Sequence, residues 1–494
     1  MDPRRHSPPR RVRAVLRLVC AALTAAAGTL PAAEALHWAL AGPDAEGYSL
    51  EASGSAKDDA GAHLRIHSMT PKPGSFAAAG SRLDATGLAG KHVRITADLR
   101  AESGAPDGYL WLRIDGEKPG LLSVTGREFA VKPGAEWQAR TLTLPVLPDA
   151  RYIAFGVAQS GEGSMEARNV RIQTFEPGPP TLKAAMQLGA AIDAVRNHAY
   201  YSSRIDWNAT VPQLREWNRG SSGPEDVYWI IRELLTRLGD KHSSVLHPAS
   251  AKAMITAGTD NSPVVAQKLA GGIVEVDVPG YTGLDAEAEE HYAAAGRNRI
   301  AVASRAAPCG WIIDLRQNTG GNLWPMLGSL QAFFGNEPWG YSLRANGKRT
   351  PWSPPPGILD ASAAKQAGAL AGKPVAVLIG PRTASAGEAV AIALHSRAHS
   401  RTFGEPSRGV PTANATITLP DGGFLVLTVA LQMDLAGRTY DSALIPDESA
   451  EGDAVVDAAK NWLRSLRPQC AGAPARGKLP SNGGQLGTGR SGPG

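Results

Sequence analysis

The sequence predicts a multidomain protein in which an N-terminal β-sandwich is followed by a helical region and an α/β core. Three observations predict this fold class. The 494 residues exceed what a single hydrophobic core supports, so two or three domains are expected. Residues 36–176 consist of short segments in which apolar and polar residues alternate, whereas residues 260–466 alternate strands with helices. Between these parts, residues 181–250 carry apolar residues at helical spacing.

The first 35 residues are predicted to be a secretory signal peptide. Basic residues precede an apolar stretch over residues 14–30, and Ala33, Glu34 and Ala35 then provide the small-x-small pattern that a signal peptidase needs. The apolar stretch is too short and too interrupted for a membrane span, and no later run of about 20 apolar residues follows it. We therefore expect an exported protein, periplasmic or secreted, without a stable membrane span.

Charge and cysteine usage limit the possible partners. Six arginines against Asp2 and Glu34 give the leader a net charge of +4, so the +5 of the whole chain leaves about +1 for the mature form. We therefore expect no nucleic-acid partner. Cys20 lies in the leader, which leaves Cys309 and Cys470 in the mature chain. Export permits a disulfide between them, and two separate buried thiols are the alternative.

The predicted β-sandwich comes first in the mature chain. Its strand pattern is clearest at residues 93–99 and 109–114, which are separated by turns rich in Gly and Asp. The closing segments look like the last strands of a jelly roll of the carbohydrate-binding type. We therefore predict that this domain contacts carbohydrate through Trp111 or Trp137. The alternative is that these tryptophans belong to the core.

A linker separates the sandwich from the helical region. Residues 176–180 contain three prolines, and consecutive prolines cannot enter a sheet or a helix interior. Beyond the linker, Pro224 is expected to open a helix that ends in the loop carrying His242. The last residues, 471–494, contain almost nothing apolar and are predicted to be disordered.

The α/β core contains a glycine-rich turn after the buried strand predicted over residues 310–316. Gly320 and Gly321 lie in this turn, immediately before a helix predicted over residues 323–334. Paired glycines let backbone N–H groups point at a ligand, and the start of a helix adds the positive end of its dipole. Such a turn can bind an oxyanion. A plain strand-to-helix turn is the alternative.

A second buried strand, over residues 374–380, leads into a tight turn that carries Ser385 before a helix over residues 389–395. The serine hydroxyl would be exposed above the sheet, and the N–H of Ala386 could donate a hydrogen bond to the developing oxyanion. The alternative is a serine that only caps the helix. His242 lies in a separate loop, and imidazole suits a general base because it titrates near the working pH.

Together these segments resemble the signature motifs of the tail-specific, or C-terminal processing, peptidases. The first motif is Asp-Leu-Arg-Gln-Asn-Thr-Gly-Gly at residues 314–321, the second is Thr-Ala-Ser-Ala-Gly-Glu at 383–388, and a third match runs from 409 to 447. The resemblance covers roughly residues 185–465. It implies an α/β core of the crotonase-like type and a serine-type peptidase that cleaves proteins or peptides through an acyl-enzyme, without cofactor or metal.

The resemblance also bears on the general base. Many relatives use a lysine 25 residues after the serine, but Val410 occupies that position here. The chain therefore resembles the nisin-resistance-like branch, in which a histidine in an Asp-x-His-Ser loop takes the proton. The predicted site residues are the nucleophile Ser385, the base His242, the oxyanion-hole residues Gly321 and Ala386, and the auxiliary residue Asp441.

Three further points complete the expectations. Many relatives insert a PDZ domain of about 80 to 100 residues, for which residues 246–271 leave no room. His395 and His399 have the spacing of a metal pair but no third ligand, so no metal site is predicted. The alternative is that both histidines lie near the C-terminus of a helix because its dipole favours them there. The rival function is that of a non-catalytic protein that binds a hydrophobic ligand or a peptide on the same fold.

Overall fold

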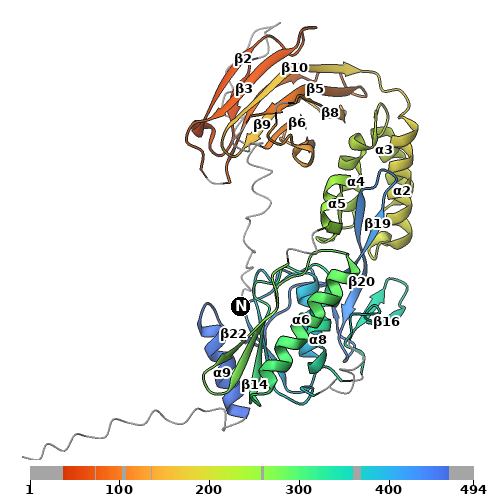
Figure 1. Ribbon diagram of the computed structural model, residues 1–494. Helices are drawn as coiled ribbons and strands as arrows, with labels where there is room; N and C mark the ends of the chain where they lie inside the picture. Colours follow the sequence, from red (N-terminus) through yellow and green to blue (C-terminus); the bar gives the residue numbers. More distant parts are fainter. Residues whose placement is uncertain are drawn as a thin grey trace, which may run out of the picture. The chain divides into compact units, whose positions relative to one another are not determined.

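A computed structural model gives the fold and describes residues 37–72, 74–102, 107–134, 136–256, 261–335, 337–359 and 369–466. The predicted signal peptide (1–35) and the predicted disordered tail (471–494) lie outside these residues. The chain forms two compact units (Figure 1). The first unit comprises Met1–Ala249 with Thr416–Val426, and the second comprises Ser250–Ala415 with Leu427–Gly494.

The N-terminal part of the first unit consists of two five-stranded antiparallel sheets (Figure 1). One sheet has the order β1 (Ala39–Ala41), β4 (Phe76–Asp84), β9 (Tyr152–Ser160), β6 (Asp107–Asp115), β7 (Leu122–Thr125). The other has the order β2 (Tyr48–Ser53), β3 (Ala62–Ser68), β10 (Ser164–Phe175), β5 (His92–Ala101), β8 (Gln138–Pro145). Buried and half-buried residues alternate along β5, as expected for a strand with one face on a core. The jelly-roll arrangement stays a prediction.

The helical part of the first unit follows the proline-rich linker. Its elements are α2 (Leu182–His198), η3 (Ser202–Arg204), α3 (Trp207–Trp217), η4 (Pro224–Val227), α4 (Tyr228–Thr236) and the short strand β11 (Ser244–Leu246). Pro224 opens a single 3-10 turn, and the α-helix begins at Tyr228. A distant segment joins these helices, because the hydroxyl of Tyr228 donates a hydrogen bond to the carboxylate of Asp421 at 2.7 Å.

The second unit is built on a mainly parallel sheet. Its strand order is β12 (Val265–Leu269), β13 (Ile273–Asp277), β14 (Gly310–Asp314), β17 (Val375–Ile379), β18 (Ser400–Gly404), β22 (Glu448–Ser449). Only the pairing of β12 with β13 is antiparallel among these strands. All five residues of β17 are buried, as expected for a strand covered on both faces.

Helices cover both faces of this sheet. Alternate strand residues enter two different apolar clusters: Trp311 packs in one with α8 (Ala386–His395), and Ile312 packs in the other with α9 (Ala454–Leu466). The remaining helices of the unit are α5 (Pro248–Thr256), whose first two residues belong to the first unit, α6 (Ala286–Ser304) and α7 (Leu323–Ser329), with a 3-10 turn η6 (Gln331–Phe333) after α7. The strand and helix alternation confirms an α/β core, while the crotonase-like assignment stays a prediction.

A second group of strands is built around the long strand β20 (Phe424–Met433). Phe424–Val426 pair with β11 within the first unit, and the end of β20 pairs with β15 in the second unit. The other members of this group are β15 (Tyr341–Arg344), β16 (Arg349–Pro351), β19 (Thr412–Thr418) and β21 (Thr439–Tyr440).

Two helix boundaries differ from the predicted ones. The helix expected over residues 323–334 ends at Ser329, whose hydroxyl donates to the carbonyl of Pro325 four residues earlier. Such back-bonding by serine disturbs the helix, and a 3-10 turn follows. Helix α8 begins at Ala386, before the predicted start at 389, because Ser385 takes the N-cap position.

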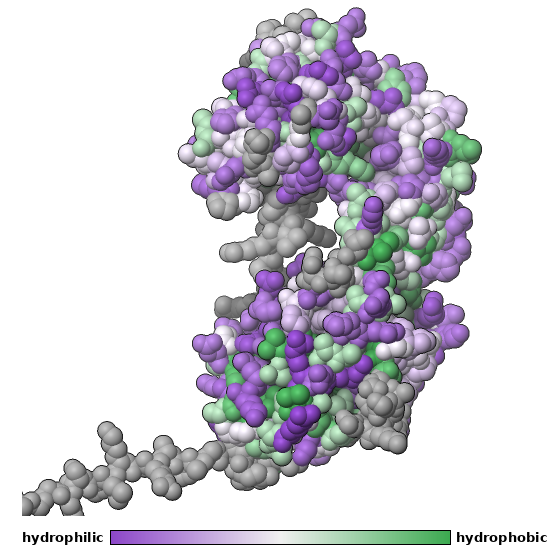
Figure 2. Space-filling view, in the orientation of Figure 1, coloured by the Kyte–Doolittle hydropathy of each residue, from purple (hydrophilic) through white to green (hydrophobic). Residues whose placement is uncertain are grey.

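The surface separates polar from apolar residues as in an ordinary folded protein. On the face drawn in Figure 2, hydrophilic side chains predominate over the two five-stranded sheets. Among the residues that the structure describes, no helix is both long and apolar enough to cross a membrane.

Candidate active site

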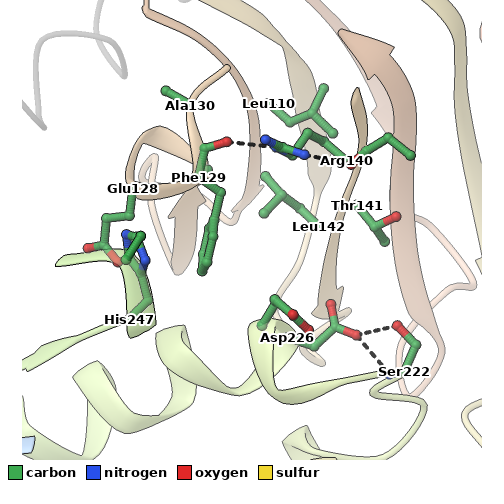
Figure 3. Close-up of a pocket in the computed structure, with 14 residues that line it drawn as sticks. Leu110, Glu128, Phe129, Ala130, Arg140, Thr141, Leu142, Ser222, Asp226 and His247 are labelled. Atoms are coloured by element: carbon green, nitrogen blue, oxygen red, sulfur yellow. Dashed lines mark hydrogen bonds between the residues drawn. The ribbon is translucent and has the colours of Figure 1, made fainter. Parts of the chain in front are cut away.

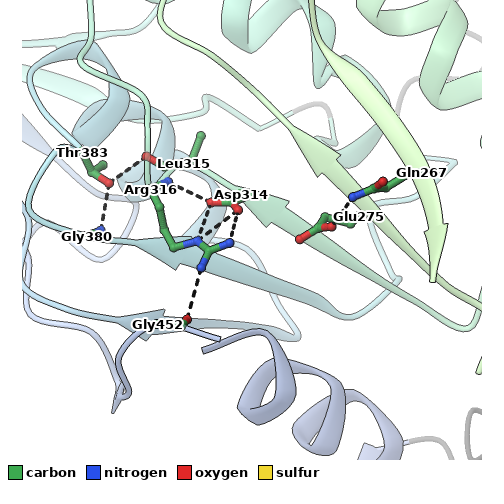
Figure 4. A network of polar contacts seen from close by, with 8 residues as sticks. All are labelled: Gln267, Glu275, Asp314, Leu315, Arg316, Gly380, Thr383 and Gly452. Carbon is green, nitrogen blue, oxygen red and sulfur yellow. Dashed lines mark hydrogen bonds and ion pairs between the residues drawn. The ribbon is translucent and has the colours of Figure 1, made fainter. Parts of the chain in front are cut away.

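The two predicted turns lie at the same edge of the sheet, because β14 and β17 are parallel neighbours. The side chain of Thr383 joins their ends (Figure 4). Its fully buried hydroxyl accepts the N–H of Gly380 at 2.9 Å and donates to the carbonyl of Leu315 at 2.8 Å. Thr383 therefore fixes the turn after β17 on the end of β14.

Asn318 makes a second connection between the turns. Its side chain is fully buried, donates from Nδ2 to the carbonyl of Val278 at 2.9 Å and accepts the N–H of Gly320 at 2.9 Å. Its own carbonyl accepts the N–H of Ala384 at 3.0 Å. The glycine-rich turn and the serine turn are thus held together by one buried amide residue.

Both glycines of the first turn lie too close to a neighbouring backbone segment to carry a side chain. Gly320 has a φ of +94°, and a Cβ there would lie 2.6 Å from the carbonyl oxygen of Ala384 and 2.8 Å from Cβ of Ser385. Gly321 has a φ of +109°, and a Cβ there would lie 1.9 Å from the carbonyl oxygen of Tyr281. A side chain at position 320 would push the two turns apart, and one at position 321 would collide with the segment that follows β13.

Ser385 occupies the N-cap position of α8 but not the usual N-cap conformation. An ordinary N-cap residue has an extended backbone, whereas Ser385 has φ +54° and ψ −120°. Positive φ is uncommon for residues other than glycine and costs of order 1–3 kcal/mol, and such strain concentrates at functional sites. The half-buried Ser385 thus forms a capping box with Glu388 but differs in backbone conformation from an ordinary cap, and its role as the nucleophile stays a prediction.

Glu388, one turn into α8, accepts hydrogen bonds from the serine turn and from the segment 407–410. It is fully buried, and its acceptor contacts include the N–H of Ser385 at 2.8 Å and the N–H of Val410 at 3.0 Å. Burial raises the pKa of this carboxyl above its ordinary value of 4.5, against the lowering effect of its hydrogen bonds. Position 410, where many relatives of the predicted family carry lysine, thus contributes a backbone donor here.

His242 lies in the first unit, in the loop after α4. The carboxylate of Asp240 shapes this loop by accepting the N–H of His242 at 2.9 Å and both the N–H and the hydroxyl of Ser243. Burial lowers the pKa of His242 below its ordinary value of 6.5, and the Asp240 carboxylate partly opposes the shift. The imidazole therefore stays neutral, as a general base must be, to a lower pH than an exposed histidine.

Of the predicted site residues, the structure brings together those on the two turns. Gly321 and Ala386 follow Gly320 and Ser385 directly, so all four lie where the turns meet. Asp441 is exposed, just after β21 in the second unit. Its auxiliary role and that of His242 as the base stay predictions.

Sequence reasoning gave no role to four residues that hold these loops. Asn318, Thr383 and Glu388 lie inside the quoted motifs, and Asp240 lies in the Asp-x-His-Ser loop. Each is a polar residue two or three positions from a predicted site residue, and this closeness in sequence was the available signal.

A separate cavity of about 520 Å³ lies in the first unit, between the sheets and the helical part (Figure 3). Arg140 and Leu142 of β8 face Asp226 across it, and Phe129 and His247 line one side. None of its lining residues is a predicted site residue.

The tryptophans proposed for carbohydrate contact are both engaged with protein groups. Trp111 is only 4% exposed and belongs to an apolar cluster, in agreement with the alternative stated above. The guanidinium groups of Arg100 and Arg168 lie 4.6 Å and 4.2 Å from the centroid of the Trp137 ring. The structure therefore gives the carbohydrate prediction no specific support.

Two other predictions from the sequence concern a metal site and a disulfide. In the described residues, no group of three His, Cys, Asp or Glu side chains is arranged to hold a metal ion. His395 instead contacts the carboxylate of Asp447 at 3.1 Å. Cys309 is disulfide-bonded. Whether it pairs with Cys470 stays open, because Cys470 lies outside the described residues.

Comparisons with known proteins agree with the resemblance seen in the motifs. Residues 286–450 match peptidase family S41. Over 276 residues the chain is 24% identical to the nisin-resistance protein of Lactococcus lactis subsp. lactis, covering 54% of this chain and 82% of that protein. This confirms the predicted resemblance to the C-terminal processing peptidases and their nisin-resistance-like relatives.

Solved structures were also compared. A lipoprotein from Streptococcus agalactiae shares the fold with a TM-score of 0.53 and 24% identity, over 57% of this chain and 97% of that chain. The photosystem II D1 C-terminal processing protease matches with a TM-score of 0.41 and 16% identity, over 55% of this chain and 93% of that chain.

Proposed function

We propose that this chain, whose residues 286–450 match peptidase family S41, is an exported serine peptidase acting on peptides or proteins through Ser385 and His242. The family match itself supports a serine peptidase. The observation that carries the assignment of the nucleophile is the strained backbone of Ser385 at φ +54°, on a turn that packs against Gly320. Strain of this kind is maintained only where the surroundings enforce it.

The proposed reaction is acyl transfer. His242 takes the proton of the Ser385 hydroxyl as its oxygen attacks the peptide carbonyl, and the N–H groups of Gly321 and Ala386 stabilise the oxyanion. The C–N bond then breaks, and the imidazolium gives its proton to the leaving amine. Water, deprotonated by the same imidazole, hydrolyses the ester and restores Ser385.

Covalent labelling tests the nucleophile. A fluorophosphonate should label the mature wild-type chain at Ser385 and leave Ser385→Ala unlabelled, whereas a non-catalytic binding protein on the same fold should not react. Peptides released from an unfolded protein, and from nisin because a relative is named for resistance to it, are identified by mass spectrometry. Absence of labelling and of cleavage in the wild type would favour the binding-protein alternative.

A second comparison tests the base. Loss of a general base lowers turnover by orders of magnitude while the fold is retained. His242→Ala should therefore cleave peptides at least about 10²-fold more slowly than the wild type, with an unchanged circular dichroism spectrum. His198→Ala, at the exposed end of α2, is the matched control and should keep full activity. Equal rates for His242→Ala and the wild type would exclude this base.

Export is part of the proposal. It rests on the arginine-rich and apolar leader over residues 1–35, and the disulfide at Cys309 fits an oxidising compartment. N-terminal sequencing of the protein recovered from the periplasm or the medium should begin near residue 36. Recovery of the full-length chain in the cytosol alone would contradict export.

A further inference from the structure

We propose that Glu388 is a positioning residue whose ionised carboxylate holds Ser385 in its strained backbone conformation and fixes the segment 407–410 beside it. The inference rests on the proposed peptidase function and adds to it the group that keeps the nucleophile in place. Glu388 is not proposed to touch the substrate, because its carboxylate is fully buried and occupied by protein donors.

The carboxylate of Glu388 acts as the acceptor in each of its hydrogen bonds. Oε2 accepts the N–H of Ser385 at 2.8 Å and the N–H of Val410 at 3.0 Å. Oε1 accepts the N–H of Gly409 at 3.0 Å and the hydroxyl of Ser407. Two donors meet each oxygen, so an ionised carboxylate can accept all four bonds, whereas an amide would place its N–H against the N–H of Gly409 or against those of Ser385 and Val410.

The first of these bonds acts directly on the nucleophile. The N–H of Ser385 donates to Oε2 across the first turn of α8, as in a capping box, while Ser385 itself has a φ of +54°. A hydrogen bond to a charged acceptor is among the stronger ones in proteins, and its stabilisation is of the same order as the cost of such backbone strain. Glu388 can therefore offset the strain that presents the hydroxyl.

The other bonds hold the segment 407–410 against the same turn. Ser407, which is buried, also accepts the N–H of Leu444 through its hydroxyl at 2.8 Å. The N–H of Arg408 donates to the carbonyl of Thr383 at 2.9 Å. The carboxylate is thus the common acceptor for two chain segments separated by about 20 residues, and its loss would loosen both.

The matched control is Asp447, another carboxylate of the second unit that accepts several donors. It receives the N–H and the hydroxyl of Thr402 at 2.8 Å and 2.9 Å, and it contacts His395. Its hydrogen bonds go to Thr402 and His395, which lie outside the serine turn. Asp447→Asn and Glu388→Gln therefore both exchange a multiply bonded carboxylate for an amide, but only the second affects Ser385.

The experiment measures the second-order rate of fluorophosphonate labelling in the wild type, Ser385→Ala, Glu388→Gln and Asp447→Asn, together with thermal unfolding. We expect Glu388→Gln to be labelled about 10²-fold more slowly, with a reduced kcat and a nearly unchanged KM for peptides. Asp447→Asn should be destabilised yet labelled within threefold of the wild-type rate. If Glu388→Gln does not fold, Glu388→Asp is used instead. It keeps the negative charge but places it farther from the four donors, and it should be labelled at least tenfold more slowly than the wild type.

The outcomes separate this inference from the proposed function. A labelled wild type with an equally reactive Glu388→Gln, or with an equally reactive Glu388→Asp, would overturn the positioning role and leave the peptidase intact. Equal slowing of Glu388→Gln and Asp447→Asn would also overturn it, because loss of stability alone would then explain the effect. A wild type that is not labelled at Ser385 would overturn the proposed function itself.

Discussion

At Gly320 a single missing Cβ allows the two turns of the candidate site to meet. Gly437 is a useful comparison because it has a similar positive φ, +87°, but no atom within 4 Å of the Cβ that it lacks. Alanine at either position is strained by the backbone, at a cost of about 1–2 kcal/mol. Only at Gly320 does it also collide with the backbone of the serine turn.

We therefore expect Gly320→Ala to lose fluorophosphonate labelling by about 10²-fold or more, whereas Gly437→Ala should keep the wild-type rate. Both variants should unfold at lower urea concentrations than the wild type. Gly320→Ala should unfold at a lower urea concentration than Gly437→Ala. Equal labelling of the two variants would show that the approach of the turns does not matter for the nucleophile.

The second residue-scale prediction concerns pH. Burial lowers the pKa of His242 below 6.5, so a neutral base persists to lower pH, and the acid limb of kcat/KM should be centred below 6.5. The same shift stabilises the fold at neutral pH, and this contribution is lost as pH falls from 6.5 through the lowered pKa. An NMR titration of the His242 ring, identified by its loss in His242→Ala, checks the assignment. An acid limb above 6.5 would contradict it.

At the scale of elements, the joined ends of β14 and β17 depend on the buried hydroxyl of Thr383 (Figure 4). Thr383→Val keeps the shape of the side chain but leaves the N–H of Gly380 without its acceptor, at a cost of about 1–3 kcal/mol. Thr383→Ser keeps the hydroxyl and should lose less, about 1 kcal/mol for the buried methyl group. Urea unfolding measures both, and a valine variant as stable as the serine variant would contradict the role of the hydroxyl.

The strand-turn-helix segments of the site could be predicted from local sequence, because buried strands and glycine turns leave a pattern within about 15 residues. The role of Glu388 could be predicted only in part. The Ser-x-x-Glu spacing indicates a capping box, in which the glutamate accepts the N–H of the serine, but its partners Ser407, Gly409 and Val410 come 19 to 22 residues later. Contacts of this range arise from the fold and leave no local periodicity.

For the whole molecule, the same limit explains why the grouping of the chain was not foreseen. The segment Thr416–Val426 belongs to the first unit, although the surrounding sequence belongs to the second. The bond of Tyr228 to Asp421 spans 193 residues of sequence, and β11 pairs with Phe424–Val426. The sequence of β20 is apolar along most of its length, and this does not say which unit the strand joins.

The division into two units, each with its own core, predicts two unfolding transitions in calorimetry. Ile95 on β5 and Leu463 on α9 are fully buried in the first and the second unit, respectively. Alanine at either site should cost about 2–5 kcal/mol and lower the melting temperature of its own unit by about 2–4 °C per kcal/mol. Ile95→Ala should leave the other transition in place, as should Leu463→Ala. A single transition that both variants shift equally would show that the units unfold as one.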